Sequence, residues 1–332
     1  MDLSSSYRTH LQTLSAGAAA ALEKTGHSAL LIHSGTPLKK TEADDQYWAL
    51  RVTPHFHHWL PLTEPGCAVL FVPGKKPSLL RAVHDSYWEA LREPESEHFW
   101  AEFEVRGPAT KDELPKGRVA FVGDDLRAAR ELGLESVNHP ELVRMLDQLR
   151  VRKTEYEVQC LAEANVRAAR GHEELRRLFA EADHSELELH LSFLGKTLQD
   201  DLETPYKNIV ALGKHAATLH HITYDKHAHP AMSMLVDAGA TFCGYGSDVT
   251  RTWVKDGGEA GAVFRGIVER MEALQQRMCA LVKPGMPYEE LHDESHRQVA
   301  TIIREVGLSR LSEEELRTPE HQITARAQCA MQ

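Results

Sequence analysis

The sequence predicts two domains, an α/β domain in the first half of the chain and an α+β domain in the second. Three observations support this prediction. The chain has 332 residues, of which 42% are hydrophobic, and this suffices for two cores. Helical and strand patterns alternate up to about residue 150. Beyond that point, long amphipathic helical patterns surround short strands separated by glycines, as in antiparallel pairs.

The first half begins with an amphipathic helix. Its apolar stripe recurs at helical spacing and consists of Leu11, Leu14, Ala18, Ala21 and Leu22. Strand patterns follow at 27–33, 67–72 and 118–122. We expect an α/β domain with a central sheet over residues 1–150, ending at the charged passage 149–153.

The second half opens with a long helix over 154–180. Its apolar face should pack on a sheet and consists of Val158, Leu161, Ala164, Ala168, Leu175, Leu178 and Phe179. Ser185 and Glu188 form a capping-box pattern for another helix that extends to about Lys196.

Two further helices are predicted near the end. The first carries Phe264, Ile267, Val268, Met271, Leu274, Met278 and Leu281 and stops at Pro284 and Gly285. The second covers 288–306, with Gly307 as its C-terminal cap.

The segment LVDAGATFCGYGSDVTRTW carries the strongest chemical signal. Residues 232–238 and 247–254 predict two antiparallel strands, with turn and bulge conformations at Gly239, Gly244 and Gly246. Asp237 closes the first strand and Asp248 opens the second, so both carboxylates can reach one face. A hard divalent metal would relieve their repulsion. Two alternatives stay open: each aspartate bonds its own backbone in a turn, or Asp248 pairs with Arg251.

A second informative stretch is PYKNIVALGKHAATLHH. It predicts a strand at 208–212 that Gly213 ends, followed by a loop with His215 and His220. Such loops line clefts, where the imidazole of His220 could orient a substrate carboxylate or a developing oxyanion.

The motifs NIVAL, HAATLH, LVDAG and GSDVTRTW, in this order and spacing, resemble the pita-bread metallopeptidases, and among them the bacterial Xaa-Pro dipeptidases, or prolidases. Residues 44–67 resemble the amino-terminal domain of the same group. The resemblance implies an α/β prolidase domain at 1–150, the first part of a pita-bread catalytic domain at 151–316, and a divergent tail at 317–332.

The resemblance also implies an activity. Members of this family hydrolyse Xaa-Pro dipeptides with two divalent metal ions, typically manganese (Mn2+), that activate water. By motif position, Asp237 binds one ion and Asp248 bridges both. His220 matches the catalytic histidine that contacts the substrate, and Tyr206 matches a tyrosine that lines the substrate pocket.

Asp44 and Asp45 match a loop that reaches the active site of a partner subunit in this group, which implies a homodimer. The chain departs from the family pattern in two places. His221 stands where the family commonly has tyrosine. The Pro-His-Gly-x-Gly-His motif and two later glutamates, which provide the other three metal ligands, are absent.

We therefore expect an incomplete, C-terminally truncated pita-bread domain, weak metal binding, impaired activity and partial unfolding beyond about residue 200. Glu320 and His321 in the tail are interpreted as solvated surface rather than substitute ligands. A non-catalytic relative and an organophosphate (phosphotriester) hydrolase remain alternatives. Metal stabilisation and parallel assays of the two substrate classes would separate them.

Composition narrows the partners and the compartment. The net charge of −11 argues against nucleic acid and anionic membranes as partners. Five cysteines without a C-x-x-C pair indicate no disulfide framework. No export signal or membrane-spanning run is predicted, so a cytoplasmic location is expected. His55, His57 and His58 are interpreted as packing residues in a loop, and His227 and His229 as part of a polar turn before Pro230.

Overall fold

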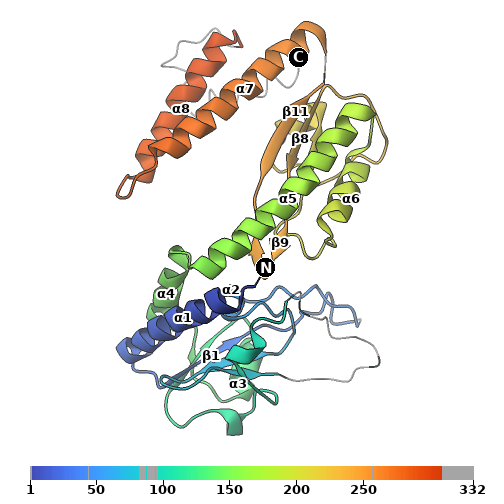
Figure 1. The fold of residues 1–332 in the computed structure, drawn as a ribbon. Coiled ribbons are helices and arrows are strands. Elements are labelled where there is room, and N and C mark those ends of the chain that lie inside the picture. The colour runs from blue at the N-terminus through green and yellow to red at the C-terminus, as the bar shows by residue number, and fades with distance from the viewer. Residues whose placement is uncertain are drawn as a thin grey trace. The chain divides into compact units, whose positions relative to one another are not determined.

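A computed structural model describes residues 2–43, 45–81, 87, 94, 96–255 and 257–308. Asp44 and the predicted tail at 317–332 lie outside the described residues. The chain forms two compact units (Figure 1). The first contains Met1–Glu163 and Thr241–Tyr245, and the second contains Ala164–Ala240 and Gly246–Gln332.

The first unit is built on a six-stranded mixed sheet with the order β4-β3-β2-β1-β5-β6. β1 pairs antiparallel with β2 and parallel with β5. The strands are β1 (Ala29–His33), β2 (Ala68–Phe71), β3 (Ser78–Leu80), β4 (Glu104–Arg106), β5 (Val119–Val122) and β6 (Ser136–Val137). The predicted α/β character and the three predicted strands of this half are confirmed.

The first unit also contains helices. They are α1 (Ser4–Thr25), α2 (Pro54–Trp59), α3 (Leu126–Glu131), α4 (Pro140–Val151) and the start of α5 (Glu155–Glu181), with 3-10 turns η1 (Trp100–Glu102) and η2 (Lys111–Glu113). All five predicted apolar positions of α1 are buried. α1 and α4 lie side by side because Gly17 leaves room for the Leu149 side chain (Figure 1). Ala129 of α3 and Leu132, which follows this helix, share one core with the sheet.

Two predictions in this half are wrong. Residues 55–58 belong to helix α2 rather than a loop, because Pro54 occupies the first helical turn and Phe56, His58 and Trp59 are buried. Residues 149–151 belong to α4 rather than to a passage between elements. That helix also begins with a proline, Pro140, and His139 caps it by accepting from the Leu142 amide.

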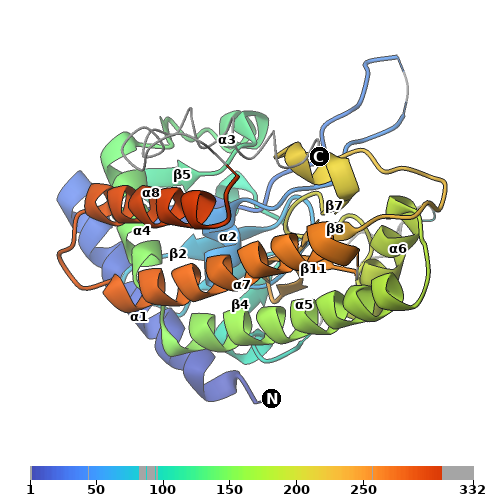
Figure 2. The same ribbon diagram turned by 90° about the horizontal axis from the view of Figure 1, so that it is seen from above.

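The second unit contains a three-stranded antiparallel sheet with the order β11-β8-β7, covered by α5 and α6 (Glu186–Thr197) (Figures 1 and 2). Its strands are β7 (Ile209–Leu212), β8 (Ser233–Asp237) and β11 (Thr250–Val254). Leu175 and Phe179 of α5 and Leu189 and Phe193 of α6 share one core with this sheet. The predicted packing of the long helix is confirmed there, whereas Val158 near its start is 49% exposed.

The capping box of α6 is present as predicted, with Ser185 and Glu188 bonded reciprocally. The predicted strand pair is also present: β8 and β11 are antiparallel, with Asp237 opposite Thr250. Two short strands, β9 (Thr241–Phe242) and β10 (Tyr245–Gly246), pair with each other and lie between β8 and β11 in the chain. Asp248 precedes β11, whereas the sequence predicts it as the first residue of that strand.

The glycines of this hairpin serve different purposes. Only Gly244 has a positive φ, 82°. A Cβ at Gly239 would lie 2.0 Å from the Ser247 carbonyl oxygen, and a Cβ at Gly246 would lie 2.6 Å from Pro205. The positive φ expected of a turn glycine is therefore found at Gly244, while the close approaches at Gly239 and Gly246 give a second reason for glycine in this hairpin.

The last two predicted helices are confirmed as α7 (Gly258–Leu281) and α8 (Tyr288–Glu305), which run side by side (Figure 2). Leu274 of α7 packs against Val299, Ala300, Ile302 and Ile303 of α8. Gly307 follows α8 with a φ of 71°, as expected for a C-terminal cap. In the described ranges, we find no helix with the length and apolar character to span a bilayer.

Candidate functional site

The carboxylates of Asp237 and Asp248 meet at one hydroxyl group. The Tyr206 hydroxyl lies 2.7 Å from Oδ1 of Asp237 and 3.1 Å from Oδ1 of Asp248. A single phenol O–H can donate to one of these oxygens at a time, so the two carboxylates share one donor. Three residues that the sequence singles out separately therefore form one polar cluster.

The sheet fixes the position of this cluster. Asp237 is the last residue of β8, the central strand, where it lies between Ile209 of β7 and Thr250 of β11. Directly after Asp237, the Ala238 amide donates to the carbonyl of Val249, the residue that follows Asp248, at 3.1 Å. This bond holds the chain just beyond Asp248 against the end of β8, so backbone pairing brings the two carboxylates together.

The electrostatics of the cluster keep the proton on Tyr206. Burial raises the pKa of the Tyr206 phenol, and the adjacent carboxylates of Asp237 and Asp248 raise it further. The alternative ion pair between Asp248 and Arg251 is not found among the described residues, and the Arg251 guanidinium donates to the Thr250 carbonyl instead. No other cation balances the two carboxylates in the interactions described.

The remaining predicted site residues are His220 and Asp45. His220 is exposed in the connection between β7 and β8, after η3 (Gly213–Ala217). Among the described residues, no hydrogen bond or ion pair joins it to Asp237 or Asp248. Asp45 belongs to the first unit and is exposed in a loop closed by a bridge between Lys39 and Tyr47.

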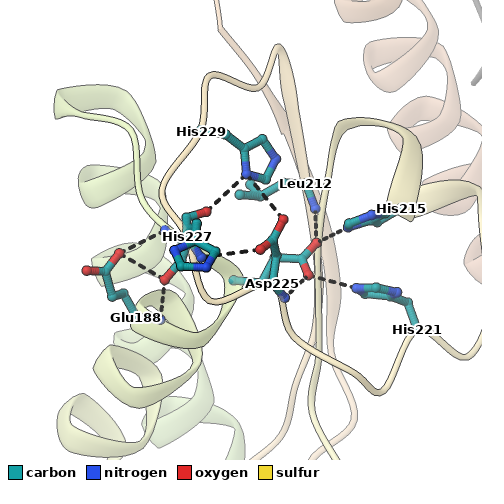
Figure 3. A network of polar contacts seen from close by, with 9 residues as sticks. Glu188, Leu212, His215, His221, Asp225, His227 and His229 are labelled. Atoms are coloured by element: carbon teal, nitrogen blue, oxygen red, sulfur yellow. Dashed lines mark hydrogen bonds and ion pairs between the residues drawn. The ribbon is translucent and has the colours of Figure 1, made fainter.

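Sequence reasoning missed a second cluster, centred on Glu186. This side chain is completely buried, and its Oε1 accepts from the Leu212 amide at 2.9 Å and from Nδ1 of His215 at 2.7 Å. Its Oε2 accepts from the Asp225 amide at 2.8 Å and from Nε2 of His221 at 2.8 Å (Figure 3). Burial alone would raise the pKa of Glu186, but these four hydrogen bonds lower it overall.

A third cluster joins three elements of the first unit and was also missed. His10 of α1, His58 of α2 and Glu157 of α5 are all buried. Burial lowers the pKa of His10 to about 4. Burial opposes ionisation of Glu157, but the His58 ring, whose Nε2 lies 3.4 Å from Oε1, and the hydrogen bond from the Thr154 amide lower its pKa to about 2. His58 had been interpreted only as a packing residue.

The ligand atoms of the three clusters differ in type and number, and this difference decides which metal each could hold. Carboxylate oxygens on one face are the donors that hard divalent ions prefer. In the described residues, the groups with at least three His, Cys, Asp or Glu ligand atoms within 4.8 Å of one another are the Glu186 and Glu157 clusters, and neither includes the aspartates. By donor type the aspartate pair therefore fits a hard divalent ion, for which it offers two carboxylates.

Comparisons with known proteins agree with the fold. Residues 5–149 match the family model of the Xaa-Pro dipeptidase N-terminal domain, and residues 159–313 match metallopeptidase family M24. Proline aminopeptidase P II from Yersinia pestis has a similar structure, with a TM-score of 0.71 at 18% identity, covering 92% of this chain and 77% of that one. Aminopeptidase PepP of Pseudomonas aeruginosa gives 0.69 at 18% identity, covering 95% and 76%.

Curated relatives extend the match along the sequence. An Xaa-Pro dipeptidase of Pseudoalteromonas atlantica is 32% identical over 95% of this chain and 72% of its own length. An Xaa-Pro dipeptidase of Xanthomonas campestris is 36% identical over 94% of this chain and 71% of its own length. With an α/β amino-terminal unit, a pita-bread second domain and these relatives, the chain belongs to the Xaa-Pro dipeptidase family of M24 metallopeptidases.

Proposed function

We propose that Asp237 and Asp248 are ligands of a divalent metal centre and that this centre serves the hydrolysis of Xaa-Pro dipeptides. The observation that carries the proposal is the approach of both carboxylates to the single hydroxyl of Tyr206. Two negatively charged carboxylates that share one hydrogen-bond donor repel each other. A divalent cation is the partner that their geometry and oxygen donors favour. Family membership supplies the reaction class.

Each residue of the cluster has a distinct part in this proposal. Asp237 and Asp248 would hold the metal, which when bound would supply Lewis acidity at the scissile carbonyl. Tyr206 keeps its proton on Oη, because burial and both carboxylates raise its pKa, so its hydroxyl can donate to an aspartate or to a substrate oxygen. His220 is exposed and free to approach a dipeptide, whose carboxylate or developing oxyanion it would orient.

The metal that we propose is Mn2+, and we expect the aspartate pair alone to hold it weakly. Two carboxylates provide less charge and less geometric constraint than the six or more oxygen ligands that hard cations usually take. We therefore expect activity to be low unless further ligands join the pair.

We also retain the homodimer as a proposal. The loop around Asp45 exposes three large apolar side chains, since Leu38 is 74%, Tyr47 is 49% and Trp48 is 61% exposed. Exposed apolar side chains gathered on one loop are typical of a surface that contacts a partner.

The test compares Asp237→Asn and Asp248→Asn with the matched control Asp201→Asn, which changes an exposed aspartate in a turn. Hydrolysis of Gly-Pro and the rise of melting temperature with Mn2+ are measured for each purified chain. We expect both effects to disappear in the two site variants and to persist in the control. Equal Mn2+ stabilisation of wild type and site variants would contradict the proposal.

The same experiment separates the alternatives. A wild-type chain that gains no stability from Mn2+ and hydrolyses neither Gly-Pro nor a phosphotriester would be a non-catalytic relative. Cleavage of the phosphotriester without cleavage of the dipeptide would favour organophosphate hydrolysis on the same residues.

A further inference from the structure

The Glu186 cluster contains the ligand set of a second kind of metal site. Its three side chains come from different segments: Glu186 begins α6, His215 lies in η3, and His221 lies in the following loop. Their ligand atoms all lie within 4.8 Å of one another. Figure 3 shows His215 and His221 directed at the same carboxylate, and their rings stack with centroids 4.6 Å apart.

The carboxylate of this cluster is buried, whereas its two imidazole rings are partly exposed to solvent, so an ion could reach them. The Glu186 carboxylate is fully buried, while the His215 and His221 side chains are 32% and 12% exposed. The carboxylate is also fixed in place, because the Leu212 and Asp225 amides donate to its two oxygens. Such outer hydrogen bonds orient a ligand without occupying all of its lone pairs, since a carboxylate offers about four acceptor positions.

The imidazoles can free a ligand nitrogen by tautomerisation, which leaves each ring neutral. As neutral rings, His215 and His221 carry their protons on the nitrogens that face Glu186, Nδ1 and Nε2 respectively. Each proton can move to the other ring nitrogen, which leaves a lone pair directed at the carboxylate. Two imidazole nitrogens and one carboxylate then converge, which is a ligand set of zinc sites with an open position.

We propose that Glu186, His215 and His221 bind a borderline transition-metal ion, with Zn2+ as the probe, independently of the aspartate pair. Imidazole nitrogen selects Zn2+ and related ions, whereas the oxygen-only donors of Asp237 and Asp248 select hard ions such as Mn2+. The two clusters of this unit should therefore respond to different metals. The Glu157 cluster has similar residue types but is closed to solvent, with side chains no more than 7% exposed.

The test uses the whole chain, freed of metal by a chelator and titrated with Zn2+ in a calorimeter. The key variant is the double substitution His215→Asn and His221→Gln. Each new amide places an N–H donor near the position of the original ring nitrogen, so the hydrogen bonds to Glu186 can persist, but an amide nitrogen does not ligate Zn2+. We expect the variant to lose one equivalent of Zn2+ or to bind it at least about tenfold more weakly.

The matched control removes another histidine pair, His292 and His296, which are exposed on α8 with their Nε2 atoms 3.0 Å apart. His292→Asn with His296→Asn should keep the equivalent assigned to Glu186, as should Asp237→Asn with Asp248→Asn. Circular dichroism verifies that each variant is folded, and His215→Asn alone serves if the double variant is not. Unchanged Zn2+ stoichiometry and affinity in the folded His215 and His221 variants would overturn the proposal.

Discussion

The aspartate pair and the Glu186 cluster lie in the same unit but differ in how many hydrogen-bond donors their carboxylates have. Asp237 and Asp248 are two carboxylates with one shared donor, the Tyr206 hydroxyl. Glu186 is one carboxylate with four donors. A carboxylate with its full complement of hydrogen bonds contributes to stability, whereas carboxylates that lack partners are kept for a ligand. Without metal, the Glu186 carboxylate therefore contributes to stability through its own hydrogen bonds, whereas the two aspartates depend on a ligand to balance their charge.

The largest effect should follow the substitution Glu186→Ala. It leaves the buried amides of Leu212 and Asp225 and two imidazoles without their acceptor, and we expect a loss of about 3–5 kcal/mol of stability in the second unit. Asp248→Ala should cost much less, because its carboxylate is exposed and shares its donor. Urea unfolding followed by hydrogen exchange of peptides from each unit measures both. Similar losses for the two variants would break the comparison.

Acid should weaken the contribution of Glu186 to stability. The folded state lowers the pKa of Glu186 below its ordinary value of 4.5. Its contribution to stability is therefore complete above pH 4.5 and is lost as the pH falls through the lowered pKa, since the unfolded state then binds the proton more readily. We expect the Leu212 and Asp225 amides to lose protection from exchange in this range.

The variant Glu186→Gln provides the control for the acid experiment, because its side chain does not titrate. Protection of the same two amides in this variant should not change as the pH falls from neutral through the lowered pKa of Glu186. A wild-type chain with the same flat profile would show that Glu186 is not the group responsible.

Comparing the sequence with the structure explains why only one of these clusters was predicted. The pattern around Asp237 and Asp248 could be interpreted locally, since strand periodicity and the intervening glycines indicate a hairpin that brings the two residues together. Glu186 offers no such signal. It follows the helix cap Ser185 and stands two residues before Glu188, and nothing in the local sequence tells the buried glutamate from the capping one.

The helices, too, were predictable only where the local sequence pattern determines their burial. Long amphipathic segments such as α1 and α5 were predictable because their burial follows a period of 3.6 residues. The short helix α2 was not, since its three histidines suggest a polar loop, and only tertiary packing against His10 and Glu157 buries His58. The Glu157 cluster is equally remote in sequence, because His10, His58 and Glu157 come from three helices that only tertiary packing brings together.

A moderate effect is expected for Tyr206→Phe. The ring is kept, but the one donor shared by Asp237 and Asp248 is removed, which should cost about 1–2 kcal/mol in metal-free protein. Because a divalent ion can replace that donor, Mn2+ should restore more stability in this variant than it adds to the wild type. Melting curves with and without Mn2+ measure the difference. An equal Mn2+ shift in both proteins would mean that the hydroxyl and the ion do not serve the same carboxylates.

The smallest expected effect tests whether the anchoring of Glu186 depends on its helix. Ser185 caps α6 through its hydroxyl, which accepts from the Glu188 amide at 3.2 Å, so Ser185→Ala should cost about 1 kcal/mol. The first turn of α6 should fray, and Glu186 lies in that turn. Its four hydrogen bonds oppose fraying, however, because they bind the turn to Leu212, His215, His221 and Asp225. In Ser185→Ala, amide exchange should therefore increase at Glu188 and remain slow at Leu212; rapid exchange at both would mean that the cap, rather than the carboxylate, holds this end of the helix.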